Sequence, residues 1–324
     1  MTRWVRQLMA FGLAAQSLGA AAQDFPSKPI RLIVPFAPGG STDVIARIVA
    51  PALSRALGQS VVIENKPGGG GTTGTLEMLR APADGHTLAM ATASTVAANP
   101  AINPKAPYGP ADLTAIVNLA ATPTVIAVHP SFPAQNYAGF LAELKRRPGQ
   151  YSYASSGVGG ISHLQMEAFK SQTKTFITHI PYRGAAPALN DTIGGQVHIV
   201  MDAFPSAGGF IKAGKLRPIV VTSPKRLAAM PDVPTFADVG LPQMNRMSSF
   251  GIIGQKALPA DIVRKINAAA RSALEDAAVR QRIEDSGAAV VGGPPEQYNA
   301  DIQAEYTQLK RVVEEQKLTL DGAS

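Results

Sequence analysis

The chain contains no cysteine, which excludes disulfide bonds, thiolate metal sites, a cysteine nucleophile and a lipid-modified N-terminal cysteine. Charged residues make up only 16% of the 324 residues and hydrophobic residues 45%, a composition typical of a chain with a sizeable core and not of a disordered one. No run of five basic residues is present, so we expect no nucleic-acid partner. After the N-terminal segment, no apolar run reaches the roughly eighteen residues that a membrane span needs. The length predicts about two globular domains.

Residues 1–22 have the features of a secretory signal peptide. Arg3 and Arg6 precede a short apolar stretch at 8–18, and three alanines end at Ala22. We expect cleavage after Ala22, which removes two of the positive charges and lowers the net charge from +7 to +5. A short N-terminal helix is the alternative. The signal peptide predicts export, and no cysteine is present to carry a lipid anchor. We therefore expect the mature protein to be free in a Gram-negative periplasm.

Strand and helix patterns alternate along the mature chain. The expected strands are 30–34, 60–64, 86–91, 124–128, 151–155, 178–181, 197–201 and 217–222. The expected helices are 44–57, 72–80, 137–146, 162–171, 260–286 and 295–316. Pro51 removes one backbone hydrogen bond, so two shorter helices are an alternative to the first. Strands joined by helical crossovers predict the α/β class, with largely parallel sheets covered on both faces.

A glycine loop at residues 35–43 joins the first expected strand to the first expected helix. Gly39 and Gly40 allow the backbone to approach a ligand closely, and the three polar residues that follow are suited to capping the helix. In an open α/β sheet, such a helix N-terminus presents unpaired N–H groups to the ligand crevice. The loop therefore predicts an anion site, above all for a carboxylate, while an ordinary glycine-rich turn is the alternative.

A second glycine loop at residues 155–164 also follows an expected strand and precedes an expected helix. Ser162 and Gln165 have the spacing of a capping box. Two such loops in two α/β blocks predict two helix N-termini that face one ligand across a cleft. That arrangement holds an anion with backbone dipoles and hydroxyl groups and needs no arginine, although a coincidence of two ordinary turns is the alternative.

Residues 31–43 (RLIVPFAPGGSTD) resemble the opening block of the tripartite tricarboxylate transporter substrate-binding family, also known as the Bordetella uptake gene family. Further segments resemble family blocks and follow in the family's order, at residues 64–68, 84–88, 153–157, 163–164, 179–184, 186–189, 195–197, 212–217 and 231–235. Each block is weak alone, but their shared order is highly specific. The resemblance covers nearly the whole mature chain, from about Phe25 to the C-terminal helices.

The resemblance implies a type II periplasmic-binding-protein fold, in which two α/β lobes are joined by two crossover segments and the ligand lies between them. By analogy, we place the crossovers near 124–129 and 249–254. Lobe 1 would then comprise residues 23–123 together with 246–324, and lobe 2 residues 124–245.

The resemblance also implies that a ligand carboxylate is held between the first loop and the matching loop of lobe 2. Carried over residue by residue, the expected ligand-binding residues are Phe36, Pro38, Gly39, Gly40, Ser41, Thr42, Asp43, Ser155, Ser156, Gly157 and Gly159. Thr92, Ser94 and Asp202, which follow expected strands, are weaker candidates. Asp43 is unexpected beside an anion, so it either caps the helix with its side chain turned away or selects an ammonium group.

The chain departs from the family pattern at two positions. Ser249-Phe250 stands where an indole-bearing aromatic residue is common before the second crossover, and Ala37 replaces a common proline in the pocket floor. Two glycine motifs also mimic nucleotide-binding sequences. The motif at 69–74 lacks the acidic residue of a dinucleotide site, so we interpret it as a loop flanking the cleft. The motif at 209–215 lacks the Ser or Thr that would bind magnesium, so we interpret it as a helix C-cap.

The sequence offers no catalytic constellation. The five histidines lack metal-ligand spacing, and neither a Gly-x-Ser-x-Gly elbow nor a His-Glu-x-x-His motif is present. His163 either borders the ligand or has a core or capping role. We therefore expect no catalytic residues, no metal and no cofactor. An enzyme that acts on a carboxylate is a less favoured hypothesis.

The leading hypothesis is a monomeric periplasmic solute-binding protein that closes around a small organic carboxylate and delivers it to a membrane permease with one large and one small integral subunit. The alternative is a sensor whose loaded form docks on a periplasmic sensor-kinase domain. The sequence does not distinguish dicarboxylates, tricarboxylates, acidic amino acids and aromatic acids. We favour an uncharged or carboxylate distal group, because only Asp43 and Asp202 are suited to contact an ammonium group.

Overall fold

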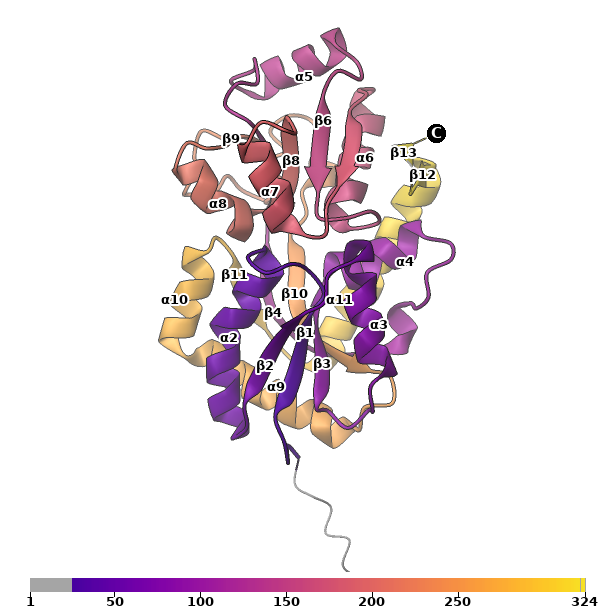
Figure 1. The fold of residues 1–324 in the computed structure, drawn as a ribbon, viewed down its shortest axis with the longest axis vertical. Helices are drawn as coiled ribbons and strands as arrows, with labels where there is room; N and C mark the ends of the chain where they lie inside the picture. Colours follow the sequence, from indigo (N-terminus) through magenta and orange to yellow (C-terminus); the bar gives the residue numbers. More distant parts are fainter. Residues whose placement is uncertain (1–24, 321, 324) are drawn as a thin grey trace, which may run out of the picture.

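The computed structural model describes residues 25–320 and 322–323, so the predicted signal peptide lies outside the described residues. Two sheets organise the chain, one above the other in Figure 1. We call the six-stranded sheet with its helices the lower half and the five-stranded sheet with its helices the upper half. No helix among the described residues has both the length and the apolar character needed to cross a bilayer.

The sheet of the lower half has the strand order β11-β4-β10-β3-β1-β2. Its strands are β1 (Ile30–Val34), β2 (Val61–Asn65), β3 (Thr87–Thr92), β4 (Leu113–Thr122), β10 (Ser248–Gln255) and β11 (Ala289–Gly292). β1 is parallel to β2 and β3, but β10 is antiparallel to β3 and β4, and β11 is antiparallel to β4. The expectation of a largely parallel sheet is wrong here, because β4 leads into the upper half and β10 returns from it in the opposite direction.

The sheet of the upper half has the strand order β7-β6-β8-β5-β9. Its strands are β5 (Thr124–Val128), β6 (Ser152–Ser155), β7 (Thr178–Pro181), β8 (Ile199–Ala203) and β9 (Arg217–Val221). β6 is parallel to β7 and β8, whereas β5 is antiparallel to β8 and β9. β5 begins directly after Pro123 and β8 ends directly before Phe204, whose backbone N–H donates to the carbonyl oxygen of Pro123 at 2.9 Å, so the two strands pair in opposite directions.

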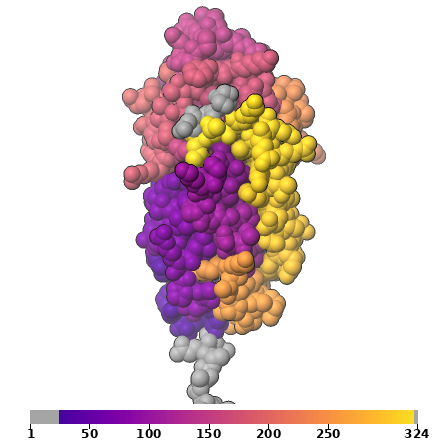
Figure 2. All heavy atoms as spheres, turned by 90° about the vertical axis from the view of Figure 1, so that its right-hand side faces the viewer, coloured from indigo at the N-terminus to yellow at the C-terminus, as the bar shows by residue number. Residues whose placement is uncertain are grey.

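Helices cover both faces of each sheet. Those of the lower half are α2 (Ser41–Leu57), η2 (Gly69–Gly71), α3 (Thr72–Arg80), η3 (Ser94–Ala98), α4 (Asn99–Ile102), η4 (Pro110–Asp112), α9 (Ala260–Glu275), α10 (Ala277–Asp285) and α11 (Pro295–Glu315). Those of the upper half are α5 (Tyr137–Arg146), α6 (Ile161–Thr173), α7 (Ala185–Ile193), α8 (Phe204–Lys212) and η5 (Pro242–Met244). Two short strands, β12 (Leu318–Thr319) and β13 (Gly322–Ala323), end the chain beside α6, and the C-terminal segment extends along both halves in Figure 2.

The period-two alternation of the strands explains why each sheet has a core on both faces. In β1, Ile30 and Leu32 pack in the cluster under α2 and α9, while Ile33 packs in the cluster on the other face. In β5, Ile126 and Val125 lie in two different clusters in the same way. Strands buried on both faces are apolar along most of their length, as β5 is, while β1 is interrupted by Arg31, which pairs with Glu64 at 2.7 Å.

Several helix boundaries differ from those expected. α2 is one continuous helix, because Pro51 lies on its exposed side while Ile45, Val49 and Leu53 are buried against the sheet. The expected helix at 260–286 is two helices, because Asp276 is extended and its carboxylate accepts the N–H groups of the first turn of α10. α7, β4, β10 and β11 were not expected from the sequence, whereas α8 ends where a helix C-cap was expected, with Gly214 at a φ of 70°.

Candidate functional site

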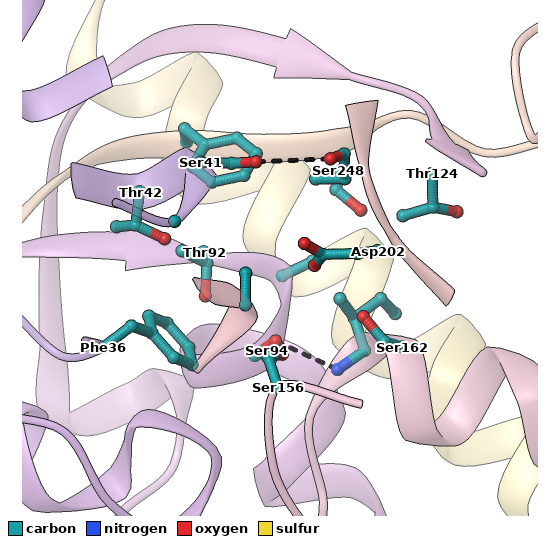
Figure 3. A pocket seen from close by; sticks show the side chains of 16 residues that line it. Phe36, Ser41, Thr42, Thr92, Ser94, Thr124, Ser156, Ser162, Asp202 and Ser248 are labelled. Carbon is teal, nitrogen blue, oxygen red and sulfur yellow. Dashed lines mark hydrogen bonds between the residues drawn. The ribbon is translucent and has the colours of Figure 1, made fainter. Parts of the chain in front are cut away.

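A narrow cavity of about 40 Å³ lies between the two halves, where strand ends and helix beginnings of both sheets converge (Figure 3). Its volume in this conformation suffices for a few water molecules. The lining residues are Phe36, Gly40, Ser41, Thr42, Thr92, Ala93, Ser94, Thr124, Ser156, Ile161, Ser162, Ala185, Asp202, Ala203, Ser248 and Phe250. Hydroxyl groups dominate this lining, and no Lys, Arg or His is part of it.

The first glycine loop delivers the beginning of α2 to this cavity. Gly39 has a φ of 83°, a left-handed conformation that favours glycine, and Gly40 is the extended residue immediately before the helix. Ser41 and Thr42 begin the helix and are buried in the cavity wall. The first backbone N–H groups of a helix have no partner within the helix, so this end of α2 offers donors to an anion.

Asp43 turns away from the cavity. Its carboxylate accepts hydrogen bonds from the backbone N–H of Gly39 at 3.0 Å, from Arg47 Nε at 2.8 Å and from Asn65 Nδ2 at 3.0 Å. Burial raises the pKa of Asp43, but the hydrogen bonds from Arg47, Gly39 and Asn65 outweigh burial and hold the pKa below its usual value. The side chain is turned away from the cavity, as the first of the two interpretations from the sequence expected, but it braces the loop through Gly39 and does not cap α2.

The second glycine loop delivers the beginning of α6 from the upper half. Gly157 and Gly159 have φ values of 141° and 76°, and Gly160 precedes the helix. The expected capping box of Ser162 and Gln165 is wrong, because the helix begins one residue earlier and its cap comes from elsewhere. Gln165 instead accepts the hydroxyl of Thr124 at 2.9 Å.

Hydrogen bonds cross the cavity between the two halves. The backbone N–H of Ile161 donates to Ser94 Oγ at 2.9 Å, which satisfies the first N–H of α6 from the lower half. The Ser41 hydroxyl donates to Ser206 Oγ at 2.9 Å, and the backbone N–H of Ser206 donates back to Ser41 Oγ at 3.1 Å. These bonds hold the beginnings of α2, α6 and α8 around one small volume.

Glycines allow the two halves to approach this closely. A Cβ added at Gly157 would lie 3.0 Å from the backbone nitrogen of Gly70, and one added at Gly70 would lie 2.6 Å from the carbonyl oxygen of Val158. The Gly69–Gly71 segment therefore flanks the cavity, which agrees with interpreting residues 69–74 as a cleft loop and not as a dinucleotide site. Nearby, the backbone N–H of Ala37 donates to the carbonyl oxygen of Arg183 at 3.3 Å.

Two histidines, the buried His163 and the half-buried His179, support the second loop from behind. His163 Nδ1 accepts the backbone N–H of Gly159 at 3.2 Å, and His179 Nε2 lies 2.7 Å from Ser155 Oγ. Their rings are stacked with centroids 4.2 Å apart. Burial is the main cause that lowers the pKa of both rings, to about 3 in His179. His163 thus has the core and capping role, and both rings are neutral near pH 7.

Asp202 is the one ionisable residue among those that line the cavity, and it is 6% exposed. Burial raises the pKa of its carboxyl to about 6, against hydrogen bonds from Ser206 and from the backbone of Ala203. Among the described residues, no group of three or more His, Asp or Glu side chains is arranged to hold a metal ion.

The structure brings together part of the residue set expected from the sequence. The expected residues that line the cavity are Phe36, Gly40, Ser41, Thr42, Thr92, Ser94, Ser156 and Asp202. The expected residues outside the lining are Pro38, Gly39, Asp43, Ser155, Gly157 and Gly159. The latter shape or brace the loops, as the hydrogen bond from the backbone N–H of Gly157 to Ser155 Oγ illustrates.

Three of the lining residues that sequence reasoning missed come from the strands that connect the halves. Thr124 begins β5, and Ser248 and Phe250 lie at the start of β10. Phe250 stands in the segment where the family pattern often has an indole, and this was the available signal. Ala185, at the start of α7, lies within 3.2 Å of a Cβ built on Gly40, so this helix closes the cavity beside the first loop.

The chain matches the family described as the tripartite tricarboxylate transporter family receptor, TctC, over residues 45–318. The chain belongs to this family. Protein BugT of Bordetella pertussis is 33% identical over 316 residues, which cover 96% of this chain and 97% of that protein. The family recognised in the sequence is therefore confirmed, and TctC proteins are periplasmic solute-binding proteins.

Solved structures share the fold of this TctC member. A periplasmic transporter superposes with a TM-score of 0.89 at 48% identity and covers 92% of this chain and 100% of its own. A Rhodopseudomonas palustris protein with adipate and MatC of the same organism with bound malate both give TM-scores of 0.86, at 32% and 31% identity. They cover 93% and 89% of this chain, and 99% and 100% of their own. The predicted two-lobed periplasmic-binding-protein fold is confirmed, and family and neighbours imply a periplasmic location.

Proposed function

We propose that this TctC protein captures a small organic carboxylate between its two lobes by hinge closure and presents it to a membrane transporter of the tripartite tricarboxylate type. The observation that carries the proposal is the convergence of the beginnings of α2 and α6, from opposite halves, on one hydroxyl-lined cavity. Two relatives of the same fold were solved with adipate and with malate.

The chemistry of the cavity suits a carboxylate. The N–H groups that begin α2 and α6 point their dipoles at the cavity, and the hydroxyls of Ser41, Thr42 and Ser156 line it. We propose that the ligand-binding set comprises the expected residues that line the cavity, with the glycines and Asp43 shaping the loops. No acid–base pair or nucleophile is needed for capture, so we assign no catalysis to this site, and a turnover assay on the identified ligand tests that assignment.

Closure follows from where the halves are connected. We infer that one hinge lies at Pro123, between β4 and β5, and the other in the segment between η5 and β10. Lobe 1 is then residues 23–123 with 246–324, and lobe 2 is residues 124–245. A ligand that contacts both glycine loops only when they are close together favours the closed state by that difference in affinity.

The export, transport and assembly steps belong to the same proposal. We propose cleavage after Ala22, a monomeric mature protein and delivery to integral permease subunits. Loss of uptake of a labelled carboxylate on deletion of the gene is the expected result for transport. The relatives add no support to the alternative of a kinase-coupled sensor.

The first experiment measures thermal unfolding of the mature protein, refolded to remove any bound ligand, against malate, adipate, citrate, glutamate and benzoate. A ligand present at a hundredfold excess over its Kd stabilises the native state by about 2.7 kcal/mol. For a chain of this size, that corresponds to a rise in Tm of several degrees. A rise confined to one class of acids identifies the ligand class, and no rise with any of the acids overturns carboxylate capture.

A further inference from the structure

Asp202 is a negative side chain in a site proposed for anions. It lies near the end of β8, and Figure 3 shows its carboxylate among the side chains that line the cavity, which include the hydroxyls of Ser94 and Ser162. Since no basic side chain lines the cavity, an anionic ligand would meet the Asp202 charge with no cation of the protein between them.

Within the described part of the chain, only neutral donors serve the Asp202 carboxylate. The Ser206 hydroxyl donates to Asp202 Oδ2, and Ser206 Oγ in turn accepts from Ser41 at 2.9 Å. The backbone of Ala203 provides a second hydrogen bond. Hydrogen bonds from neutral groups stabilise a buried carboxylate less than an ion pair does.

Charged groups on the neighbouring elements are engaged elsewhere. On α2, Asp43 pairs with Arg47 at 2.8 Å. On α6, Glu167 pairs with Lys170 at 2.7 Å, and on α7, Asp191 accepts the Tyr182 hydroxyl at 2.6 Å.

The remaining titratable groups on the packed elements are two histidines, a lysine, Tyr153 and Arg55. The Tyr153 hydroxyl on β6 donates to Glu167 at 2.7 Å, and Arg55 on α2 pairs with Asp276 at 3.1 Å. His163 on α6 and His179 on β7 stack on each other, and Lys212 lies in the last turn of α8. The pKa of Asp202 is about 6, because burial raises it and the hydrogen bonds from Ser206 and Ala203 lower it. Entry of a second negative charge would raise this pKa further, because two neighbouring carboxylates in a buried site disfavour double ionisation.

We propose that Asp202 takes up one proton from solvent when an anionic carboxylate ligand enters the cavity, so that the site binds the acid anion and a proton together. The proton adds to a carboxylate oxygen of Asp202 and turns it into an O–H donor toward the ligand. This inference rests on the proposed function. It assigns the ligand to acids that place a carboxylate or an uncharged group, and not an ammonium group, next to Asp202.

Isothermal calorimetry tests the proposal with malate or adipate, whichever raises the Tm, at pH 7.0 in buffers of different ionisation enthalpy. With a pKa of about 6, about one tenth of Asp202 carries a proton before binding, so about 0.9 proton is taken up per ligand bound. The Kd is expected to rise about ninefold from pH 7 to pH 8, where both acids are fully ionised.

Asp202→Asn is the diagnostic variant, because an amide keeps the shape and the donor but does not titrate. It is expected to bind the acid with no proton uptake and no change in Kd between pH 7 and pH 8. Asp191→Asn is the matched control, since this carboxylate lies outside the cavity lining, and it should keep the uptake of the natural protein.

The outcomes separate this inference from the proposed function. Binding of a dicarboxylate by the natural protein without proton uptake overturns the role of Asp202 but leaves carboxylate capture standing. Stronger binding of glutamate than of malate or adipate, without proton uptake, overturns the role of Asp202 in favour of an ammonium contact at this residue. If no acid of the panel binds, the proposed function falls and this inference falls with it. Should Asp202→Asn fail to fold, the measurement on the natural protein alone decides.

Discussion

The Ser94 hydroxyl oxygen lies 2.9 Å from the backbone nitrogen of Ile161 and accepts its N–H. Ser94 begins η3, directly after β3 of the lower half, and Ile161 begins α6 of the upper half. Both residues are buried, and both line the cavity. A helix cap that usually comes from the preceding residue is thus supplied across the cleft, which couples closure of the two halves to satisfaction of a helix N-terminus.

Ser94→Ala is expected to weaken ligand binding. The variant leaves the Ile161 N–H without its acceptor only when the halves are closed, so the closed state loses about 1 kcal/mol relative to the open state. This loss corresponds to about a fivefold rise in Kd, measured by calorimetry with the acid identified in the panel.

Ser171→Ala is the control for Ser94→Ala, because Ser171 lies near the C-terminal end of α6, far along the helix from the cavity. The control should keep the Kd of the natural protein. An unchanged Kd in Ser94→Ala would show that this bond does not contribute to closure.

Replacing Gly39 or Gly157 with leucine is expected to abolish binding while the protein still folds. At Gly157, a side chain would press on the Gly70 backbone of the other half, 3.0 Å from the first added carbon, and at Gly39 it would press on Ala186. Both glycines also have positive φ values, so part of the cost is local strain.

Gly214→Leu separates local strain from blocked closure. Gly214 has a φ of 70°, yet nothing lies within 4 Å of an added Cβ, so this variant carries the strain without a contact between the halves. We expect it to lower the Tm but to keep the Kd. Circular dichroism reports folding, and calorimetry reports binding. Retained affinity in both loop variants would contradict the two-loop site.

Much of the fold could be predicted because most strands are short apolar runs bounded by turn residues. The expected helix at 137–146 and the strand at 124–128 agree with α5 and β5 to the residue. β4 was missed because LTAIVNLAAT carries Thr and Asn among its apolar residues, and its place beside β10 depends on pairing over a long sequence distance. The antiparallel direction of β10 follows from the path of the chain between the halves, which local periodicity does not record.

Loop residues of the site were predictable, whereas the residues that close it were not. Gly40, Ser41 and Thr42 were expected because a glycine turn before a helix has a local signature. The partner of Ser41 is Ser206, 165 positions away, and no local pattern indicates that contact. The sequence also does not determine whether a loop side chain points into the cavity or away from it. Asp43, for example, points away and accepts a hydrogen bond from Arg47.

His179 is expected to make the protein less stable in mild acid. Burial, with charges on His163 and Lys170 adding to it, lowers its folded-state pKa from 6.5 to about 3. Between these values the unfolded chain binds more protons than the folded one, so stability is lost as pH falls below about 6.5.

His179→Gln tests this effect through urea unfolding at pH 7 and pH 5. From pH 7 to pH 5, the natural protein should lose about 1–2 kcal/mol more than the variant does, because glutamine carries no titrating group. Equal slopes in the natural protein and His179→Gln would contradict the assignment.

Glu305 and Arg246 face each other at the second connection between the halves. Together with Asn118, Ser249 and Asp301 they line a cavity of about 350 Å³ between α11 and the segment that leads into β10. Burial raises the pKa of Glu305 to about 7, with Arg246 opposing this rise and Asp301 adding to it. Burial likewise lowers the pKa of Arg246, so α11 and the hinge segment each bring to this cavity one group that is costly to keep ionised.

Glu305→Gln is expected to stabilise the protein above neutral pH. The folded-state pKa of Glu305 lies above its ordinary value of 4.5, so the folded chain binds more protons between the two values, and stability falls as pH rises toward 7 and stays lower beyond it. Glutamine removes this loss, so the variant should unfold at a free energy about 3 kcal/mol higher than the natural protein at pH 8 and match it near pH 4.5. Urea unfolding at the two pH values measures the difference. The exposed Glu314→Gln is the control, and equal stability of Glu305→Gln and the natural protein at pH 8 would show that Arg246 fully compensates the buried charge.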